Sequence, residues 1–202
     1  MRTPVVLASK SKARRELLRK ILRGSIIAVE PLFELSMPRN GNFKSAARHA
    51  VLAALTKALS VFNMNPPRNI CVIAADTVIH VDGKLLGKAK SAREAIKYLE
   101  LLRGRWHVVI TGVVVINVPE RALALDYAVT HVKMKDYTYE ELLSYVRTGE
   151  WRGKAGAYAI QGKGAILVEA IMGSYYNVVG LPVELLYELM KKVNFPLTAW
   201  LP

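Results

Sequence analysis

Two serines and an arginine near the start of the chain have the spacing of a phosphate-binding turn. Ser9, Ser11 and Arg14 follow the apolar run Val5–Ala8 and lie where a helical pattern begins. The first backbone N–H groups of a helix have no partner within the helix, and nearby hydroxyl groups add further hydrogen bonds. These residues therefore indicate a site for a phosphate group, and with it nucleotide or phosphate chemistry.

The position of Arg14 separates it from the other basic residues of this helix. At about 100° per residue, Arg14 lies on the apolar stripe formed by Leu17, Leu18, Ile21 and Leu22. An arginine there could instead be a partly buried side chain paired with a structural carboxylate. Its place in the first turn beside two serines favours the anion-binding interpretation.

A single aspartate after an apolar run is the candidate catalyst. Asp76 ends the segment Val72–Ala75, which is apolar at every position and so predicts a central strand. Ligands bind at the carboxyl ends of strands in α/β sheets, where an aspartate can hold a divalent metal ion or take a proton from water. The alternative is a hydrogen-bonded aspartate that starts a turn. The small neighbours Ala74 and Ala75 leave room for a ligand and favour a functional role.

The hairpin predicted next places a lysine near this aspartate. A two-residue turn at Asp82-Gly83 puts Lys88 opposite Thr77, on the sheet face away from Asp76 unless a bulge intervenes. A triphosphate is large enough to touch both faces. A solvated lysine on an edge strand is the alternative interpretation of Lys88.

Two further charged residues are ambiguous from the sequence. Lys57 flanks the apolar stripe of its helix, so its ammonium could either reach solvent at the rim or contact a phosphate. Glu34 follows Pro31–Phe33 in a loop, where an acidic side chain is usually solvated.

The elements that would position these residues alternate along the chain, which predicts an α/β fold. Strands are expected at 4–8, 26–30, 70–76, 78–81, 84–86, 106–117 and 122–134. Helices are expected at 11–23 and 43–62, from Ser91, from Thr138 to near Gly149, and at 182–193. The glycine-rich stretch 153–181 is expected to form hairpins and turns.

Composition excludes several classes of protein. The chain has 202 residues, 52% of them hydrophobic, enough for an ordered core. No apolar run reaches the roughly 18 residues of a membrane helix, so we expect a soluble, cytoplasmic protein with no membrane partner. One cysteine, Cys71, excludes an internal disulfide, and the four histidines lack zinc-site spacing.

The net charge of +13 predicts a polyanionic partner, either a triphosphate or a nucleic acid. The chain lacks the interleaved aromatic and basic residues that stack on bases, so nucleic acid is the weaker of these two predictions.

Several segments together resemble the Maf family of nucleoside triphosphate pyrophosphatases. They span nearly the whole chain in order and are Ala8–Arg14, Ala75–Thr77, Gly104–His107, Lys154–Gly162 and Gly173–Pro182. The resemblance implies a single Maf-like domain over residues 1–202. Its fold would be an elongated mixed α/β sheet flanked by helices, with two lobes around a cleft, similar to that of the inosine triphosphatases.

The resemblance also implies hydrolysis of a nucleoside triphosphate to the monophosphate and pyrophosphate with a divalent metal ion, Mg²⁺ or Mn²⁺. Asp76 matches the proposed general base, and Asp76, Glu34 or both would hold the metal. The matches to the family's substrate-binding positions are Ser9, Ser11, Arg14, Lys57, Thr77, Lys88 and Gln161. A homodimer is a possible assembly. The alternative function is nucleic-acid binding or control of cell division, since members similar to this family have been linked to division arrest.

Three positions bear on the choice of base. In the family, an arginine, a threonine and a glutamine mark enzymes that resemble the dTTP/UTP type. Thr77 and Gln161 match this pattern, whereas Ala13 stands where the arginine would be. We therefore expect a preference for dTTP and UTP, with looser selectivity than the full triad implies.

Overall fold

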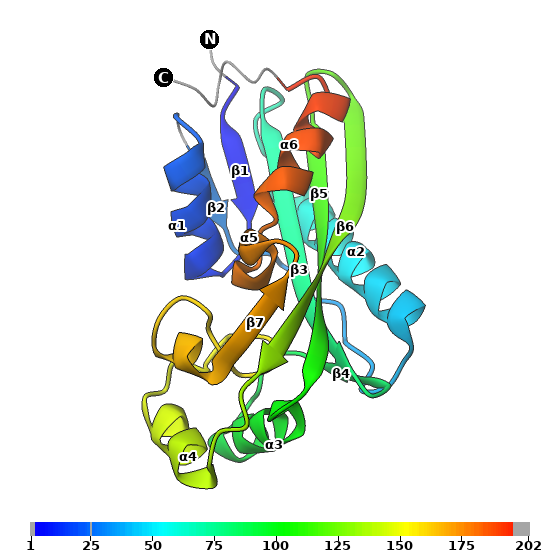
Figure 1. The fold of residues 1–202 in the computed structure, drawn as a ribbon. Coiled ribbons are helices and arrows are strands. Elements are labelled where there is room, and N and C mark those ends of the chain that lie inside the picture. Colours follow the sequence, from blue (N-terminus) through cyan, green and yellow to red (C-terminus); the bar gives the residue numbers. More distant parts are fainter. Residues whose placement is uncertain (1–2, 25, 196–202) are drawn as a thin grey trace.

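The computed structural model describes residues 3–24 and 26–195, which form a mixed α/β fold around a seven-stranded sheet (Figure 1). The strands are β1 (Val5–Ala8), β2 (Ile26–Val29), β3 (Cys71–Val81), β4 (Lys84–Leu86), β5 (Trp106–Asn117), β6 (Ala122–Met134) and β7 (Val168–Met172). The α-helices are α1 (Lys12–Ile21), α2 (Phe43–Ser60), α3 (Ala92–Leu102), α4 (Tyr139–Arg147), α5 (Tyr175–Val179) and α6 (Val183–Lys192). Two short 3₁₀ helices, η1 (Phe62–Met64) and η2 (Lys163–Leu167), complete the secondary structure of this part of the chain.

The sheet combines parallel and antiparallel pairs. Its order is β2-β1-β3-β5-β6-β7, with β4 paired to β3 outside this path. β1 runs parallel to both β2 and β3, whereas β3, β5, β6 and β7 form successive antiparallel pairs. The long strands β3, β5 and β6 run the length of an elongated molecule (Figure 1).

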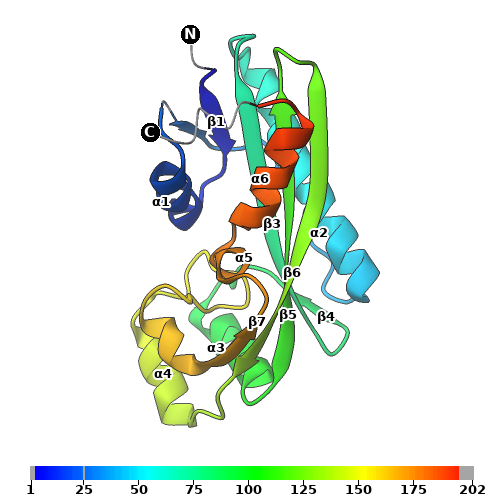
Figure 2. The ribbon, with the colours of Figure 1, turned by 45° about the horizontal axis from the view of Figure 1, so that its top comes forward.

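The helices divide between the two faces of the sheet, as Figure 2 shows. Helices α1 and α6 pack on one face, where Leu18 and Leu186 join a core with Ile73 of β3. Helix α2 packs on the opposite face, where Ala54 and Ala58 join a separate core. Helices α3 and α4 cover the far end of the sheet around a third core. Two regions of packing therefore lie along one face, with the middle of β3 between them.

β3 has a break in its pairing at one edge. β5 pairs with β3 without interruption from Cys71 to His80. On the other edge, β1 pairs only with Cys71–Ala74 and β4 only with Ile79–Val81. In the part of the chain that the structure describes, residues 75–78 have no strand partner on that edge. Since side chains alternate along a strand, Asp76 and Thr77 leave this break toward opposite faces, as the sequence predicted.

Most predicted elements are confirmed, and two expectations are wrong. The segments 70–76 and 78–81 form one strand, so Asp76 lies in the middle of β3 and not at its carboxyl end. The continuous partner β5 holds this strand straight through Asp76, and it is β1 that ends beside the site. The stretch 153–181 forms no hairpin of its own, because its strand β7 pairs with β6. The arrangement in two lobes around a cleft stays a prediction.

Candidate active site

The break in β3 connects two hollows on the surface. One hollow lies on the α1 and α5 side and is lined by Arg14 and Gln161, among others. The second lies on the α2 side and is lined by Glu34 and Lys57, among others. Of the residues that the structure describes, only Asp76, Thr77 and Lys88 line both hollows. A ligand that occupies the break can therefore touch side chains from both faces of the sheet.

The turn after β1 forms as the sequence predicted. Ser11 caps α1, its hydroxyl accepting a hydrogen bond from the backbone N–H of Arg14 at 3.3 Å. The Ser9 hydroxyl accepts from the backbone N–H of Ser11 at 3.1 Å. Ser9 is buried, whereas Ser11 lines the first hollow. The two serines thus fix the start of α1 where it faces the break in β3.

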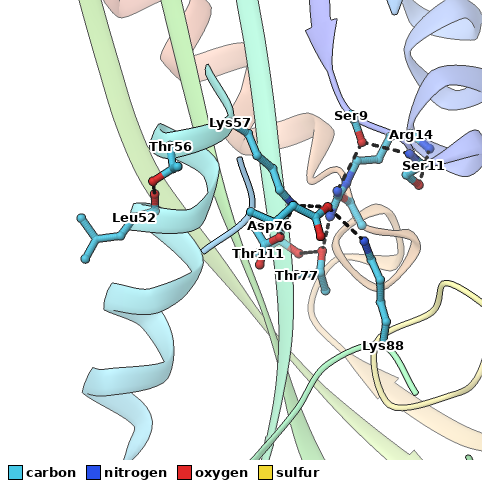
Figure 3. A network of polar contacts seen from close by, with 12 residues as sticks. Ser9, Ser11, Arg14, Leu52, Thr56, Lys57, Asp76, Thr77, Lys88 and Thr111 are labelled. Carbon is cyan, nitrogen blue, oxygen red and sulfur yellow. Dashed lines mark hydrogen bonds and ion pairs between the residues drawn. The ribbon is translucent and has the colours of Figure 1, made fainter. Parts of the chain in front are cut away.

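Arg14 is buried and held by three neutral groups (Figure 3). Its Nε donates to the Gly180 carbonyl at 2.6 Å and its Nη2 to the Thr77 hydroxyl at 2.7 Å. Its Nη1 is 3.5 Å from the Ser9 hydroxyl. A guanidinium has five N–H groups, so the others remain for an anion in the hollow. Among the described residues no carboxylate forms an ion pair with Arg14, so the alternative of a structural pair is wrong here.

Burial and nearby charges act on Arg14 in opposite directions. Burial lowers the pKa of the Arg14 guanidinium, and the Asp76 and Glu34 carboxylates oppose this effect. An arginine keeps its charge even when buried. Because its contacts are neutral, its positive charge stays available to a phosphate.

Gly180 places the main-chain acceptor for Arg14. It ends α5 with φ of +111°, a left-handed conformation that favours glycine. A side chain at this position would begin 3.4 Å from the Thr77 hydroxyl and 3.5 Å from Arg14 Nε. These are ordinary contact distances, so it is the left-handed backbone and not a lack of space that calls for glycine here.

On the α2 side, two lysines and two carboxylates form a chain of ion pairs. Lys57 Nζ is 2.5 Å from Asp76 Oδ1 and 3.9 Å from Glu34 Oε1. Lys88 Nζ is 3.7 Å from the same Glu34 oxygen. Lys57 is buried, so it does not extend to solvent at the rim of its helix. Burial lowers the pKa of Lys57, while the adjacent Asp76 raises it in opposition.

Lys88 reaches this site by a different path from the one expected. The β3–β4 pairing stops at Ile79 and Leu86, so Lys88 is not the cross-strand partner of Thr77. Instead the chain turns away and Lys88 forms an isolated bridge with Ala155. The three-residue strand β4 is too short to continue the pairing. Lys88 and Thr77 nevertheless line the same two hollows. The prediction that Lys88 lies on the face away from Asp76 is wrong, because its ammonium pairs with Glu34 on the α2 side.

The remaining predicted residues lie around the first hollow. Gln161 is exposed and lines it together with Ala13. Apolar side chains of Val109 and Val178 line its wall, next to Tyr158. Apolar and polar groups line this hollow together, and such a mixture suits a planar base with polar edges. The small Ala13 side chain leaves this part of the hollow wide.

Three residues of the site were not found from the sequence. His49 lines the second hollow and lies on the same face of α2 as Lys57, two helical turns earlier. Burial lowers the pKa of His49. Thr111 and the carbonyl of Gly180 support Thr77 and Arg14. A lone threonine within the apolar strand 106–117 is the only sequence signal for Thr111, and a main-chain carbonyl gives none.

The donor atoms at the site also suit a small divalent cation. Asp76 and Glu34 both direct a carboxylate oxygen at Lys57 Nζ, so their oxygens converge. Within residues 3–24 and 26–195 there is no cluster of three or more acidic, histidine or cysteine side chains that could hold a metal. Mg²⁺ commonly uses one or two carboxylates and completes its shell with water and phosphate oxygens. Asp76 and Glu34 therefore fit a metal that is shared with a phosphorylated ligand.

The fold and the site define a class of protein. It is a mixed α/β protein whose site joins three cationic side chains, two carboxylates and a hollow of mixed polarity, a combination that suits a nucleotide phosphate ester or anhydride.

The chain belongs to the Maf family. A family model described as "Maf-like protein" matches residues 4–193. A protein of Caldanaerobacter subterraneus subsp. tengcongensis named dTTP/UTP pyrophosphatase is 43% identical over 93% of this chain and 88% of its own length. A protein of Clostridium acetobutylicum with the same name is 38% identical over 92% of this chain and 96% of its own length. Another, of Dictyoglomus thermophilum, is 40% identical over 98% of this chain and 100% of its own length.

Proposed function

We propose that this protein hydrolyses nucleoside triphosphates, with dTTP and UTP preferred, to the nucleoside monophosphate and pyrophosphate. The observation that carries the proposal is the ion pair of Asp76 with Lys57 in the break of β3. Asp76 also lines the hollows that contain Arg14 and Lys88. The relatives named dTTP/UTP pyrophosphatase, which align over nearly the whole chain, support the substrate.

In the mechanism, Asp76 is the general base. It orients a water molecule and accepts its proton as the water oxygen attacks the α-phosphorus. Arg14, Lys57 and Lys88 bind the phosphate oxygens and offset the negative charge that develops on the departing pyrophosphate. Ser9 and Ser11 add hydrogen bonds at the start of α1. The base would lie near Gln161 in the first hollow, beside the phosphate groups held by Arg14.

Asp76 and Glu34 would hold the divalent cation, Mg²⁺ or Mn²⁺. When bound, such an ion polarises phosphate oxygens and acidifies coordinated water. Lys57, which pairs with both carboxylates, would hold them in place for the ion and would also contact phosphate oxygens. Activity should therefore depend on added metal and disappear with a chelator.

A panel of nucleoside triphosphates tests the proposal. With Mg²⁺ or Mn²⁺ present, the protein should release monophosphate and pyrophosphate in equal amounts, fastest from dTTP and UTP. Release of orthophosphate and a diphosphate would indicate cleavage at the β–γ bond and contradict the assignment. No hydrolysis of any triphosphate would also contradict it.

We also propose that two copies of the chain associate through β6. In the described part of the chain, residues 122–130 of β6 have no strand partner on the edge away from β5, and exposed Leu123, Leu125 and Tyr127 lie along them. Free edges of this kind tend to pair. Light scattering should give the mass of a dimer for the wild type and of a monomer for Leu125→Lys. A monomeric wild type would contradict this assembly.

We further propose that the protein acts in the cytoplasm. No helix among residues 3–24 and 26–195 has the length and apolar character required to cross a bilayer.

A further inference from the structure

Thr111 is a buried hydroxyl that the proposed mechanism does not use, although it lies beside the site (Figure 3). It faces Thr77 across the β3–β5 pair, with 2.9 Å between the two Oγ1 atoms. On its other side, Thr111 Oγ1 is 3.4 Å from the main-chain carbonyl of Asn177 in α5. Thr111 therefore links Thr77 to the helix that closes the first hollow.

The partners of Thr77 determine which hydrogen-bonding group it offers to a ligand. Arg14 Nη2, at 2.7 Å, can only donate, so Thr77 accepts from it. The Asn177 carbonyl can only accept, so it draws the proton of Thr111. Donation by a cation polarises the Thr77 hydroxyl and makes it a better donor. The hydrogen bonds therefore run from Arg14 through Thr77 and Thr111 to the Asn177 carbonyl.

We propose that Thr111 is a positioning residue for recognition of the base. By accepting the proton of Thr77, it leaves Thr77 with one free lone pair toward the hollow, and this lone pair accepts a hydrogen bond from an N–H of the base. The inference rests on the proposed pyrophosphatase activity and deepens it. Thr77 lines the same hollow as Gln161, which supports its contact with the base.

The free lone pair of Thr77 selects among the parts of a nucleotide. Phosphate oxygens only accept hydrogen bonds, so they do not match it. The N3 atom of uracil and thymine carries a proton and can donate, whereas N3 of cytosine is an acceptor. A Thr77 hydroxyl held in this orientation therefore favours UTP and dTTP over CTP.

The substitution Thr111→Val tests the role of this hydroxyl. Valine keeps the shape of threonine but cannot accept the proton of Thr77, which is then free to turn toward the hollow and donate. The ratio of kcat/KM for UTP to that for CTP should fall by about three- to tenfold, the size of one neutral hydrogen bond. The change should appear mainly as a higher KM for UTP. Thr111→Ser, which restores a hydroxyl, should return the wild-type ratio.

Thr130 offers a matched control on the neighbouring strand. It is also a buried threonine, and its hydroxyl contacts the Ser174 carbonyl and the Asn177 amide without touching Thr77. Thr130→Val should therefore keep the UTP to CTP ratio even if it lowers the melting temperature. Thr111→Ala removes the same hydroxyl if valine prevents folding.

Two results would overturn the role of Thr111. One is an unchanged ratio in a folded Thr111→Val or Thr111→Ala protein. The other is a wild type that hydrolyses CTP as efficiently as UTP, which needs no variant. Both leave the pyrophosphatase activity standing, whereas a wild type that hydrolyses no triphosphate would remove the proposed function as well.

Discussion

At the scale of single residues, the site depends on two side chains that leave β3 in opposite directions. Asp76 pairs with Lys57 on the α2 face, and Thr77 contacts Arg14 on the α1 face. Both are accessible because the edge of β3 is unpaired between β1 and β4. One dipeptide thus connects the proposed catalytic base to the group that holds Arg14, the arginine proposed to bind phosphate.

Asp76→Asn should remove the general base while keeping the size of the side chain. We expect kcat for UTP to fall by about 10² to 10⁴-fold, the usual contribution of a positioned base. Steady-state kinetics with Mg²⁺ checks this. Asp82→Asn, at the exposed tip of the β3–β4 hairpin, is the matched control and should keep wild-type activity. Full activity in Asp76→Asn would show that another group serves as the base.

Ala13→Arg should narrow the choice of base. The position lines the hollow together with Gln161, so an arginine there adds hydrogen-bond donors beside the base. We expect the kcat/KM of dTTP and UTP relative to ATP and GTP to rise roughly tenfold, as one charged hydrogen bond would give. Lys12→Arg adds an arginine at an exposed neighbouring position and should leave the profile unchanged. An unchanged profile in Ala13→Arg would show that this position does not contact the base.

At the scale of elements, the close packing of α2 on β5 sets the position of Lys57. A Cβ added to Gly112 would lie 2.4 Å from backbone atoms of Ala50 in α2, so the helix contacts the strand directly at this point. The small residues Ala46, Ala50 and Ala54 of α2 support the same approach. The helix must therefore stay against the sheet for Lys57 to reach Asp76.

Gly112→Ala should displace α2 from the sheet. The backbone cannot yield as a side chain can, so we expect a loss of about 1 to 3 kcal/mol in the free energy of unfolding. Activity should fall in parallel because Lys57 moves away from Asp76. Urea unfolding and UTP hydrolysis measure the two effects. Gly83→Ala, in an open turn with no atoms within 4 Å of the added Cβ, bears strain but should spare activity. A Gly112→Ala protein with wild-type stability would contradict this account of α2.

The start of β5 carries a histidine whose burial makes stability depend on pH. His107 is buried beside Tyr158, with 2.8 Å between His107 Nε2 and Tyr158 Oη. Burial lowers the pKa of His107 to about 4, from an ordinary value of 6.5. The folded protein therefore holds His107 neutral where the unfolded chain binds a proton, so stability is lost as the pH falls from about 6.5 toward 4.

Replacing His107 should remove this dependence. Between pH 7 and pH 5, the histidine accounts for about 2 kcal/mol of lost unfolding free energy in the wild type. His107→Gln keeps a polar group for Tyr158 but does not titrate, so its stability should fall less over the same interval. Urea unfolding at both pH values gives the comparison. Equal losses in the two proteins would show that His107 is not the responsible group.

At the scale of the whole molecule, the sequence predicted more of the parts than of their arrangement. The α/β class, most strand and helix positions before residue 153 and the turn holding Ser9, Ser11 and Arg14 follow from local patterns, and they are confirmed. Strand β7 and helix α5 were not predicted. The position of Asp76 in the middle of a strand could not be predicted from the sequence. The apolar run before it looks the same whether β3 ends at Asp76 or continues past the end of its neighbour β1. The placement of Lys57 and Glu34 required tertiary contacts across elements far apart in the chain.

The central claim is that this assembled site directs water to the α-phosphorus of a triphosphate. Hydrolysis of UTP in water enriched in ¹⁸O, followed by mass spectrometry of both products, tests it most directly. Attack on the α-phosphorus places one labelled oxygen in UMP and none in pyrophosphate. A label found in pyrophosphate would mean that water attacks the β-phosphorus, and it would contradict the role proposed here for Asp76.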